Sequence, residues 1–144
     1  MTSAARIVAA LGGRGVLRER PRGYDSVIDR ARAGLPYASL EAVARRFEIP
    51  QEALVRVLNL PLRTLARRKK ERRLHANESD RLLRLGRIAA LAEEVLGGRE
   101  RAAAWLRKPN RALGGASPLD RLDTDLGAKE VEQVIFRIAH GVYS

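Results

Sequence analysis

The stretch Gln51–Lys70 constrains the fold of this chain most, because two short helical patterns meet there at a sharp break. Its first half places three apolar residues on one side of a short helix: Leu54, Val55 and Leu58. Asn59 and Pro61 then interrupt the pattern, since Asn tolerates the left-handed conformation of a tight turn and Pro suits the first turn of a following helix. The stretch therefore predicts two helices joined by a tight turn.

The second of these helices is basic. We expect Leu62 and Leu65 to face inward, while cationic side chains project from its other sides. Such a helix after a tight turn is typical of a helix-turn-helix DNA-binding unit. An ordinary pair of antiparallel helices with a solvated basic face would show the same pattern, so the stretch alone leaves both interpretations open.

The composition favours helices for the rest of the chain. Charged residues make up 31% and aromatic residues 4% of the 144 residues, so the core must consist mainly of Leu, Val, Ile and Ala. A sheet would normally carry more β-branched and aromatic residues, and we therefore expect an all-α protein. The sequence has no cysteine and no apolar run long enough to span a membrane, and Arg6 interrupts any signal-peptide core. We expect a cytoplasmic protein that does not bind membranes.

The positive charge lies in the N-terminal part of the chain. Residues 1–86 carry a net charge of +10, whereas residues 87–144 carry +1. A basic part followed by a near-neutral part suggests a module that binds a polyanion, joined to one that contacts protein. Nucleic acid is a better candidate than a membrane surface, because no aromatic residue accompanies the basic cluster Arg67–Arg73.

The pattern predicts three regions: a flexible N-terminal segment over residues 1–24, a helix-turn-helix domain over 25–86 and a C-terminal domain over 87–144. Helix starts are expected at Thr2 or Ser3, at Asp25 or Ser26, at Ser39, at an Asn77 cap supported by Asp80, and at Thr124 or Asp125. The first of these helices should end near Leu11, because Gly12 and Gly13 follow it. Apolar side chains expected to face inward include Val27, Ile28, Ala31, Val131, Val134, Ile135 and Ile138. The helix that ends near Leu96 is long enough to serve as a spine shared by both domains, or to bury a partner subunit.

The second helix of the opening stretch supplies the candidate DNA-binding residues. Those expected to face the major groove are Arg63, Thr64, Arg67 and Lys70. Those expected to contact phosphates are Arg68, Lys69, Arg72 and Arg73. Units of this kind usually read two half-sites as dimers, so we expect a homodimer.

The second half of the chain resembles a known family. The matching elements are Ala104-Trp105-Leu106, Pro109-Asn110, Leu113-Gly114-Gly115, Pro118-Leu119-Asp120, Thr124, Gly127, Val131 and Gly141-Val142. They resemble the toxin-binding domain of the bacterial Xre/MbcA/ParS antitoxins, and Arg63-Thr64-Leu65 and the stretch from Asn77 to Leu82 are similar to the same family. The resemblance covers roughly residues 35–144. It departs at the turn, where Asn59 and Pro61 stand in place of the more common Gly and small polar cap.

The resemblance implies an antitoxin that binds the operator of its own operon and neutralises a co-expressed RES-domain toxin, a family associated with the destruction of NAD⁺. It implies that the C-terminal half obstructs the active site of the toxin, with which the antitoxin forms a larger hetero-oligomer. The implied toxin-binding residues are Trp105, Leu106, Pro109, Asn110, Arg111, Leu113, Gly114, Gly115, Gly141, Val142, Tyr143 and Ser144.

No catalytic, metal or cofactor site is expected. His75 and His140 are far apart and show no metal-ligand spacing, and the carboxylates from Asp120 to Asp125 suit helix capping better than a calcium loop. The residues show no defensible pair of nucleophile and base, so we expect no enzyme. The alternatives that remain are a stand-alone dimeric helix-turn-helix transcription regulator and, less favoured, a nucleic-acid chaperone without sequence preference.

Overall fold

The structure, a computed structural model, describes residues 3–17 and 23–141. The helices are α1 (Ala4–Ala10), α2 (Arg14–Leu17), α3 (Tyr24–Ala33), α4 (Tyr37–Arg46), α5 (Gln51–Leu58), α6 (Leu62–Glu71), α7 (Ala76–Leu96), α8 (Arg99–Arg107) and α9 (Asp125–Ala139), with short 3-10 turns η1 (Arg111–Leu113) and η2 (Leu119–Arg121). Within the described ranges no strand occurs beyond one isolated bridge between Pro36 and Arg73, which confirms the predicted all-α class. Among the same residues, no helix is both long enough and apolar enough to cross a membrane.

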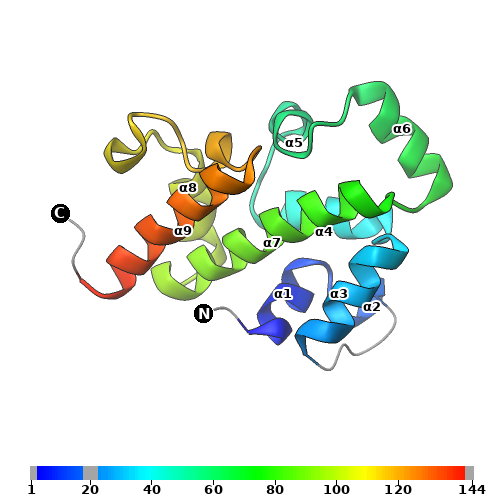
Figure 1. Cartoon of the computed structure of the whole chain (residues 1–144), viewed down its shortest axis with the longest axis horizontal. Coiled ribbons are helices and arrows are strands. Elements are labelled where there is room, and N and C mark those ends of the chain that lie inside the picture. Colours follow the sequence, from blue (N-terminus) through cyan, green and yellow to red (C-terminus); the bar gives the residue numbers. More distant parts are fainter. Residues whose placement is uncertain (1–2, 18–22, 142–144) are drawn as a thin grey trace.

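The long helix α7 runs through the middle of the molecule (Figure 1). It contacts α1, α3 and α5 from the N-terminal part of the chain and α8 and α9 from the C-terminal part. Its apolar side chains are fully buried along its length: Leu82, Leu85, Ile88, Ala89 and Ala92. Because a single hydrophobic core includes side chains from both parts, the structure confirms α7 as a shared spine.

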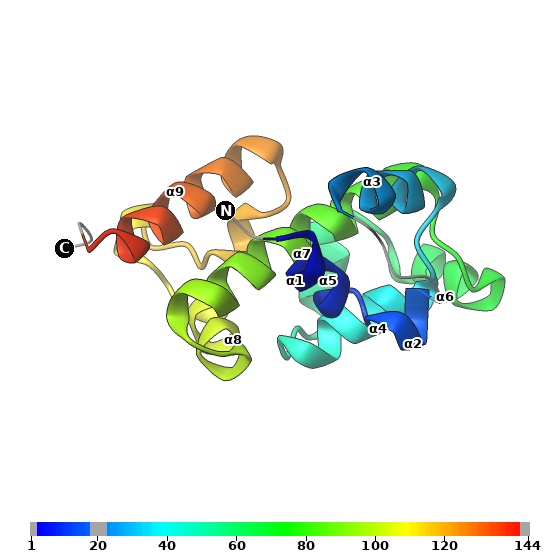
Figure 2. The ribbon, with the colours of Figure 1, turned by 90° about the horizontal axis from the view of Figure 1, so that it is seen from below.

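The helix expected near the N-terminus is α1, which Ser3 caps, but residues 3–17 are not the flexible segment that was expected over residues 1–24. Ile7, Leu11 and Leu17 are buried, and α1 and α2 pack against α7 and α4 (Figure 2). Gly12 turns the chain between these helices with a φ of 108°, a conformation that favours glycine. Residues 3–17 are therefore part of the folded core, because their apolar side chains cover α7. The arginines expected as a flexible arm lie largely in residues 18–22, outside the described residues.

Several helix starts differ from the expected ones. Helix α3 starts at Tyr24, one residue early, and Ile28 is 39% exposed rather than inward. Helix α4 starts at Tyr37, so Ser39 is a buried residue of its first turn and not the cap. Helix α7 starts at Ala76 because Glu78 reaches back and accepts a hydrogen bond from the His75 backbone N–H at 2.8 Å. The predicted Asn77 cap is therefore wrong.

The C-terminal part follows the predicted pattern closely. Thr124 caps α9, and its hydroxyl accepts a hydrogen bond from the Gly127 backbone N–H at 3.0 Å. Val131, Val134 and Ile135 are buried on the inward side of α9, while Ile138 is only half-buried. Gly127 is required sterically, since a Cβ atom there would lie 1.9 Å from the Arg121 carbonyl oxygen. The start of α9 is therefore held closely against η2.

Candidate functional site

Helices α5 and α6 form the predicted pair joined by a tight turn. Asn59 adopts the left-handed conformation, with φ 51° and ψ 50°, and ends α5. The Leu60 backbone N–H donates to the Val55 carbonyl at 3.1 Å, and the Leu60 side chain is buried. Leu65 anchors α6 to the core from the other side of the turn. The turn is thus held by a left-handed residue and by one buried leucine within it.

One side of α6 is open to solvent and basic. Arg63, Arg67 and Lys70 are exposed and recur at i, i+4 and i+7, which places them on one face of the helix. None of the three takes part in an ion pair with another described residue. Thr64 lies at the edge of this face and is half-buried. The four residues expected at the major groove therefore lie on the outer face of α6 or at its edge.

The first residue of α6 also lies on the outside. Leu62 was expected to face inward, but it is 58% exposed, whereas Leu60 and Leu65 on either side of it in the sequence are buried. An exposed leucine at the start of a recognition helix offers an apolar contact to a thymine methyl group.

Arg68 does not belong to this exposed face, which corrects its prediction as a phosphate ligand. Its Nε donates to Glu78 Oε1 at 2.8 Å and its Nη1 donates to Glu71 Oε1 at 2.9 Å, while its Nη2 lies 3.2 Å from His75 Nδ1. The Arg68 and Glu78 side chains are 8% and 5% exposed, so the pair is buried between α6 and the start of α7. Arg68 therefore positions α6 and is not free to bind DNA.

The pKa values of this pair follow from the contacts. The hydrogen bond to Glu78 raises the pKa of Arg68 above its ordinary value, against the opposing effect of burial. Burial by itself would raise the pKa of Glu78, but hydrogen bonds from Arg68 and from the His75 backbone N–H outweigh it and lower that pKa. Both groups are thus held in their charged forms.

The remaining predicted phosphate ligands lie at the end of α6. Lys69, Arg72 and Arg73 are exposed, and Arg72 ends the helix in the left-handed conformation with a φ of 62°. The backbone here is fixed to the start of α4, because the Tyr37 N–H donates to the Arg72 carbonyl at 3.1 Å and the Leu74 N–H donates to the Leu35 carbonyl at 2.9 Å. These cations are therefore carried on a fixed backbone beside the outer face of α6.

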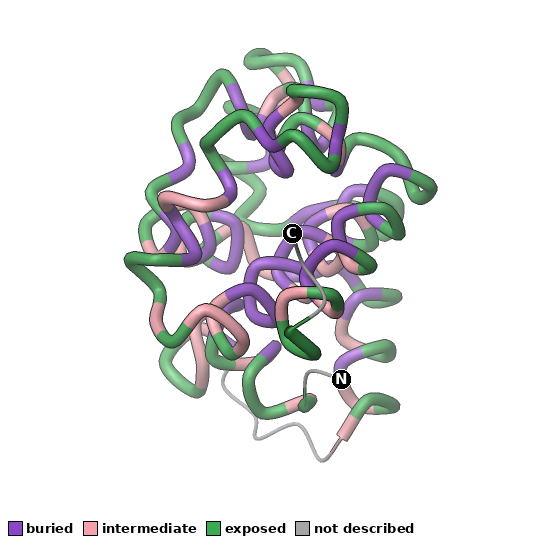
Figure 3. Tube along the Cα trace, turned by 90° about the vertical axis from the view of Figure 1, so that its left-hand side faces the viewer, coloured by how far each residue is buried: buried purple, intermediate pink, exposed green. Residues whose placement is uncertain are grey.

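The second predicted surface surrounds the loop after α8. A hollow of about 410 Å³ is lined by Trp105, Lys108, Pro109, Asn110, Arg111 and Ile138. It brings the loop next to Ile138, which lies near the end of α9 and shortly before Gly141. Figure 3 shows the molecule from this end, with exposed residues in green and buried residues in purple.

The predicted residues of the loop divide into two groups. Pro109, Arg111, Gly114 and Gly115 are exposed and Trp105 is half-buried. Three others are buried and hold the loop from inside, which corrects their prediction as direct contacts: Leu106, Asn110 and Leu113.

Asn110 shows how the loop is held. Its side-chain oxygen accepts from the Ala112 N–H at 2.9 Å, while its backbone N–H donates to the Ala116 carbonyl at 3.0 Å. Two other residues line the hollow: Lys108, which lies within the stretch that the resemblance implied, and Ile138, which the apolar pattern had assigned only to the inward side of the last helix. Gly141 is exposed at the end of the described chain, and the predicted residues Val142, Tyr143 and Ser144 lie outside it.

The described residues contain no cluster of His, Asp and Glu side chains suited to a metal ion. The two surfaces are instead suited to binding: a basic helix for a polyanion and a fixed loop for a protein. An all-α protein with a helix-turn-helix followed by a helical protein-binding region is the class that this fold defines.

Comparison with known families agrees with both surfaces. The family model "Antitoxin Xre-like helix-turn-helix domain" matches residues 26–87, and "Antitoxin Xre/MbcA/ParS C-terminal toxin-binding domain" matches residues 91–141. The antitoxin Xre of Yersinia enterocolitica is 32% identical over 120 residues, covering 82% of this chain and 81% of that protein. The antitoxin Xre of Pseudomonas putida is 41% identical over 83 residues, covering 57% of this chain and 52% of that protein. A Sphingobium protein named "Prs ADP-ribosylating antitoxin" is 26% identical over 132 residues, covering 83% of each chain.

The chain belongs to the Xre antitoxin family. This decides the question that the opening stretch left open, because α5 and α6 lie within the matched helix-turn-helix domain and are not an ordinary helix pair. The family consists of antitoxins with DNA-binding and toxin-binding parts, and its members are not enzymes.

Proposed function

We propose that this chain neutralises a co-expressed RES-domain toxin that degrades NAD⁺, by placing its C-terminal surface over the toxin's active site. The observation that carries the proposal is the hollow between the loop after α8 and the end of α9. Trp105, Lys108 and Arg111 line it, and the chain continues from α9 directly into its C-terminal residues. An exposed, fixed loop beside the end of α9 is suited to contacting a partner.

The loop is pre-formed, which supports its role as a binding surface. Its backbone is closed by the Asn110–Ala116 hydrogen bond and by the Gly115 N–H, which donates to the Asn110 carbonyl at 2.9 Å. The Arg121 side chain further donates to the Leu113 carbonyl at 2.9 Å. A loop fixed in this way loses little conformational entropy on binding, which favours affinity.

The test is toxin neutralisation by loop variants. Lys108→Glu combined with Arg111→Glu reverses two exposed charges without touching the core, and Lys129→Glu, exposed on α9 outside the hollow, is the control. The double variant should fail to protect cells from the product of the neighbouring toxin gene and should not co-purify with it, while the control does both. Full protection by the double variant would refute the proposed surface.

A second partner chemistry is suggested by one relative. The Sphingobium protein carries the name "Prs ADP-ribosylating antitoxin", so a toxin that transfers ADP-ribose to a protein is the alternative occupant of the same surface. Two measurements on the free toxin separate these candidates. One measures the loss of NAD⁺ and the other the transfer of labelled ADP-ribose to protein. Loss of NAD⁺ with no ADP-ribose attached to protein supports the degrading toxin, and attachment of labelled ADP-ribose to a protein supports the alternative.

We propose further that the chain represses its own operon through α6, as a homodimer on a palindromic operator with half-sites about 34 Å apart. Arg63, Arg67 and Lys70 read bases with Thr64 and Leu62, and Lys69, Arg72 and Arg73 contact phosphates. The support is the exposed, unpaired basic face of α6. Arg63→Ala with Arg67→Ala should abolish the preference for the operator over random DNA in a gel-shift competition at fixed salt. Retained preference would sink the assignment.

The runner-up function is a stand-alone dimeric transcription regulator whose C-terminal part only dimerises. Co-purification with the product of the neighbouring gene separates the two functions. A stable complex supports the antitoxin, and a homodimer that ignores this product supports the regulator.

A further inference from the structure

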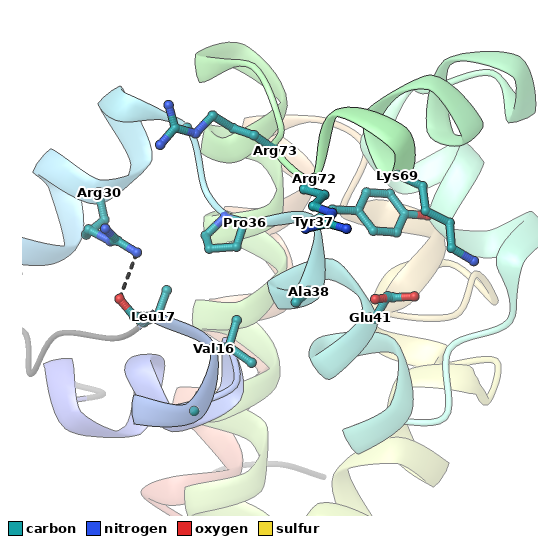
Figure 4. Close-up of a pocket in the computed structure, with 12 residues that line it drawn as sticks. Val16, Leu17, Arg30, Pro36, Tyr37, Ala38, Glu41, Lys69, Arg72 and Arg73 are labelled. Atoms are coloured by element: carbon teal, nitrogen blue, oxygen red, sulfur yellow. Dashed lines mark hydrogen bonds between the residues drawn. The ribbon is translucent and has the colours of Figure 1, made fainter.

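A second hollow lies on the flank of α6, between the end of that helix, α2 and the start of α4 (Figure 4). Its volume is about 660 Å³, within the range of about 300–1,000 Å³ that small-molecule sites occupy. One wall comes from Val16 and Leu17, which precede the matched helix-turn-helix domain of residues 26–87. This pocket is therefore partly built from a segment that the family's DNA-binding domain does not include.

The pocket is strongly positive. Arg30, Lys69, Arg72 and Arg73 line it, and Glu41 is its one acidic lining residue. Lys69, Arg72 and Arg73 form no ion pair with any other residue that the structure describes. Unneutralised arginines in a hollow are suited to phosphate groups, with which they form charge-assisted hydrogen bonds.

Arg30 is held in place at the wall of the pocket. Its Nη2 donates to the Leu17 carbonyl at 2.8 Å, which fixes the guanidinium at the pocket wall (Figure 4). Its Nε is buried and has no hydrogen-bond partner among the described residues. Arg30 therefore holds a positive charge at a fixed position on the pocket wall.

The other lining residues favour a ligand that carries apolar surface and hydrogen-bond donors in addition to phosphate. Pro36 and the half-buried Tyr37 offer apolar surface, and the Tyr37 ring lies between Arg72 and Lys69 in the close-up (Figure 4). Glu41 would repel a bare phosphate chain but accepts hydrogen bonds from hydroxyl or amino groups. Burial, together with the nearby charge of Glu41, raises the pKa of Tyr37, so its hydroxyl stays neutral and able to donate.

We propose that this pocket binds a nucleotide, with its phosphates near Arg30 and Arg73 and its sugar and base toward Tyr37 and Glu41. The combination of phosphate, hydroxyl donors and an aromatic ring in one ligand matches the cations, the carboxylate and the tyrosine of the lining. Lys69, Arg72 and Arg73 are also the residues proposed above to hold DNA phosphates. Nucleotide and operator therefore compete, and each lowers the affinity of the other by the same factor. This last consequence rests on the proposed DNA binding.

The test is calorimetric titration of the full-length protein with ADP, UDP, inorganic pyrophosphate and adenosine at one ionic strength. At least one of the two nucleotides should bind roughly tenfold more tightly than pyrophosphate and than adenosine, because only a nucleotide engages both parts of the pocket. Arg73→Ala and Tyr37→Ala should each weaken that binding by about tenfold. Arg45→Ala, an exposed position on α4 outside the pocket, removes the same charge and should change nothing.

Three results overturn the proposal. Pyrophosphate that binds as tightly as the nucleotides shows a plain anion surface, and equal losses in Arg45→Ala and Arg73→Ala show a general charge effect. Absence of binding by both nucleotides removes the site. Thermal melts of each variant verify folding before the titrations are compared. The titrations contain neither DNA nor toxin. They therefore measure nucleotide binding independently, whether or not the proposed antitoxin function is correct.

Discussion

The buried ion pair between Arg68 and Glu78 leads to the sharpest prediction about this chain. Replacing Arg68 by Met leaves the Glu78 carboxylate in a site where its side chain is only 5% exposed. Breaking a buried pair by removing one partner costs about 3–5 kcal/mol, because the remaining charge has lost its compensation. That is a large part of the roughly 5–15 kcal/mol by which domains are stable. Arg68→Met should therefore lower the free energy of unfolding in urea by about this amount.

Two comparisons make the result specific. Arg67→Met removes an exposed arginine from the adjacent position and should change stability by less than about 0.5 kcal/mol. Arg68→Met with Glu78→Gln should recover most of the loss, because no charge is then buried and the Gln oxygen still accepts from the His75 N–H. The reasoning is refuted if Arg68→Met costs no more than Arg67→Met, or if the double variant is less stable than Arg68→Met.

The same pair sets a dependence on pH. The pKa of Glu78 in the folded chain is lowered from its ordinary value of 4.5. The unfolded chain therefore binds a proton first as the pH falls. The contribution of Glu78 to stability is fully present above pH 4.5 and is lost progressively as the pH falls through the lower, folded pKa. Urea unfolding followed as the pH is lowered from roughly 6 to roughly 3 should show a steeper loss of stability for the natural chain than for the double variant.

Other perturbations test the turn, the start of α9 and the reading face. Asn59→Ala should cost about 1–2 kcal/mol in urea unfolding, because Ala keeps the Cβ that disfavours the left-handed conformation but loses the short polar side chain that lets Asn tolerate it. Asn59→Gly, which has no Cβ, should be close to neutral, and equal losses in the two variants would contradict this explanation. Gly127→Ala should cost about 1–3 kcal/mol or more, since its Cβ would meet the Arg121 carbonyl, and an unchanged melting temperature would argue against that close approach. Lys69→Ala should reduce the log–log salt slope of DNA binding by about 0.9, because this exposed side chain is proposed to neutralise one phosphate, and an unaltered slope would contradict that role.

Local features were predicted well because they depend on neighbouring residues. The break at Asn59, the Thr124 cap and the apolar side of α9 are all set by residues within a few positions of one another. The resemblance of the C-terminal half was confirmed for the same reason, because its motif elements occur in order along the chain. The predicted start of a helix was less accurate where two residues could cap it. At α7 the hydrogen bond from the His75 N–H to Glu78 makes His75 the cap in place of Asn77.

The roles of individual site residues required the tertiary structure. Arg68 and Arg67 are adjacent in one basic run, and only the packing of α6 on α7 makes the first a buried anchor and the second an exposed cation. Asn110 and Pro109 are adjacent in one loop and divide in the same way. Charge and polarity alone do not distinguish such neighbours, because burial depends on which distant segment covers each side of the backbone.

The sequence by itself determined the helical class, the tight turn between two short helices, the uneven distribution of charge and the family. Each of these follows from residue type, periodicity or order along the chain. Only the tertiary structure decided that residues 3–17 join the core, that Arg68 supports the reading helix, and that Val16 and Leu17 complete a basic pocket beside it. Those outcomes depend on contacts between segments far apart in the chain, which are made only when α1, α2, α4 and α6 assemble around α7.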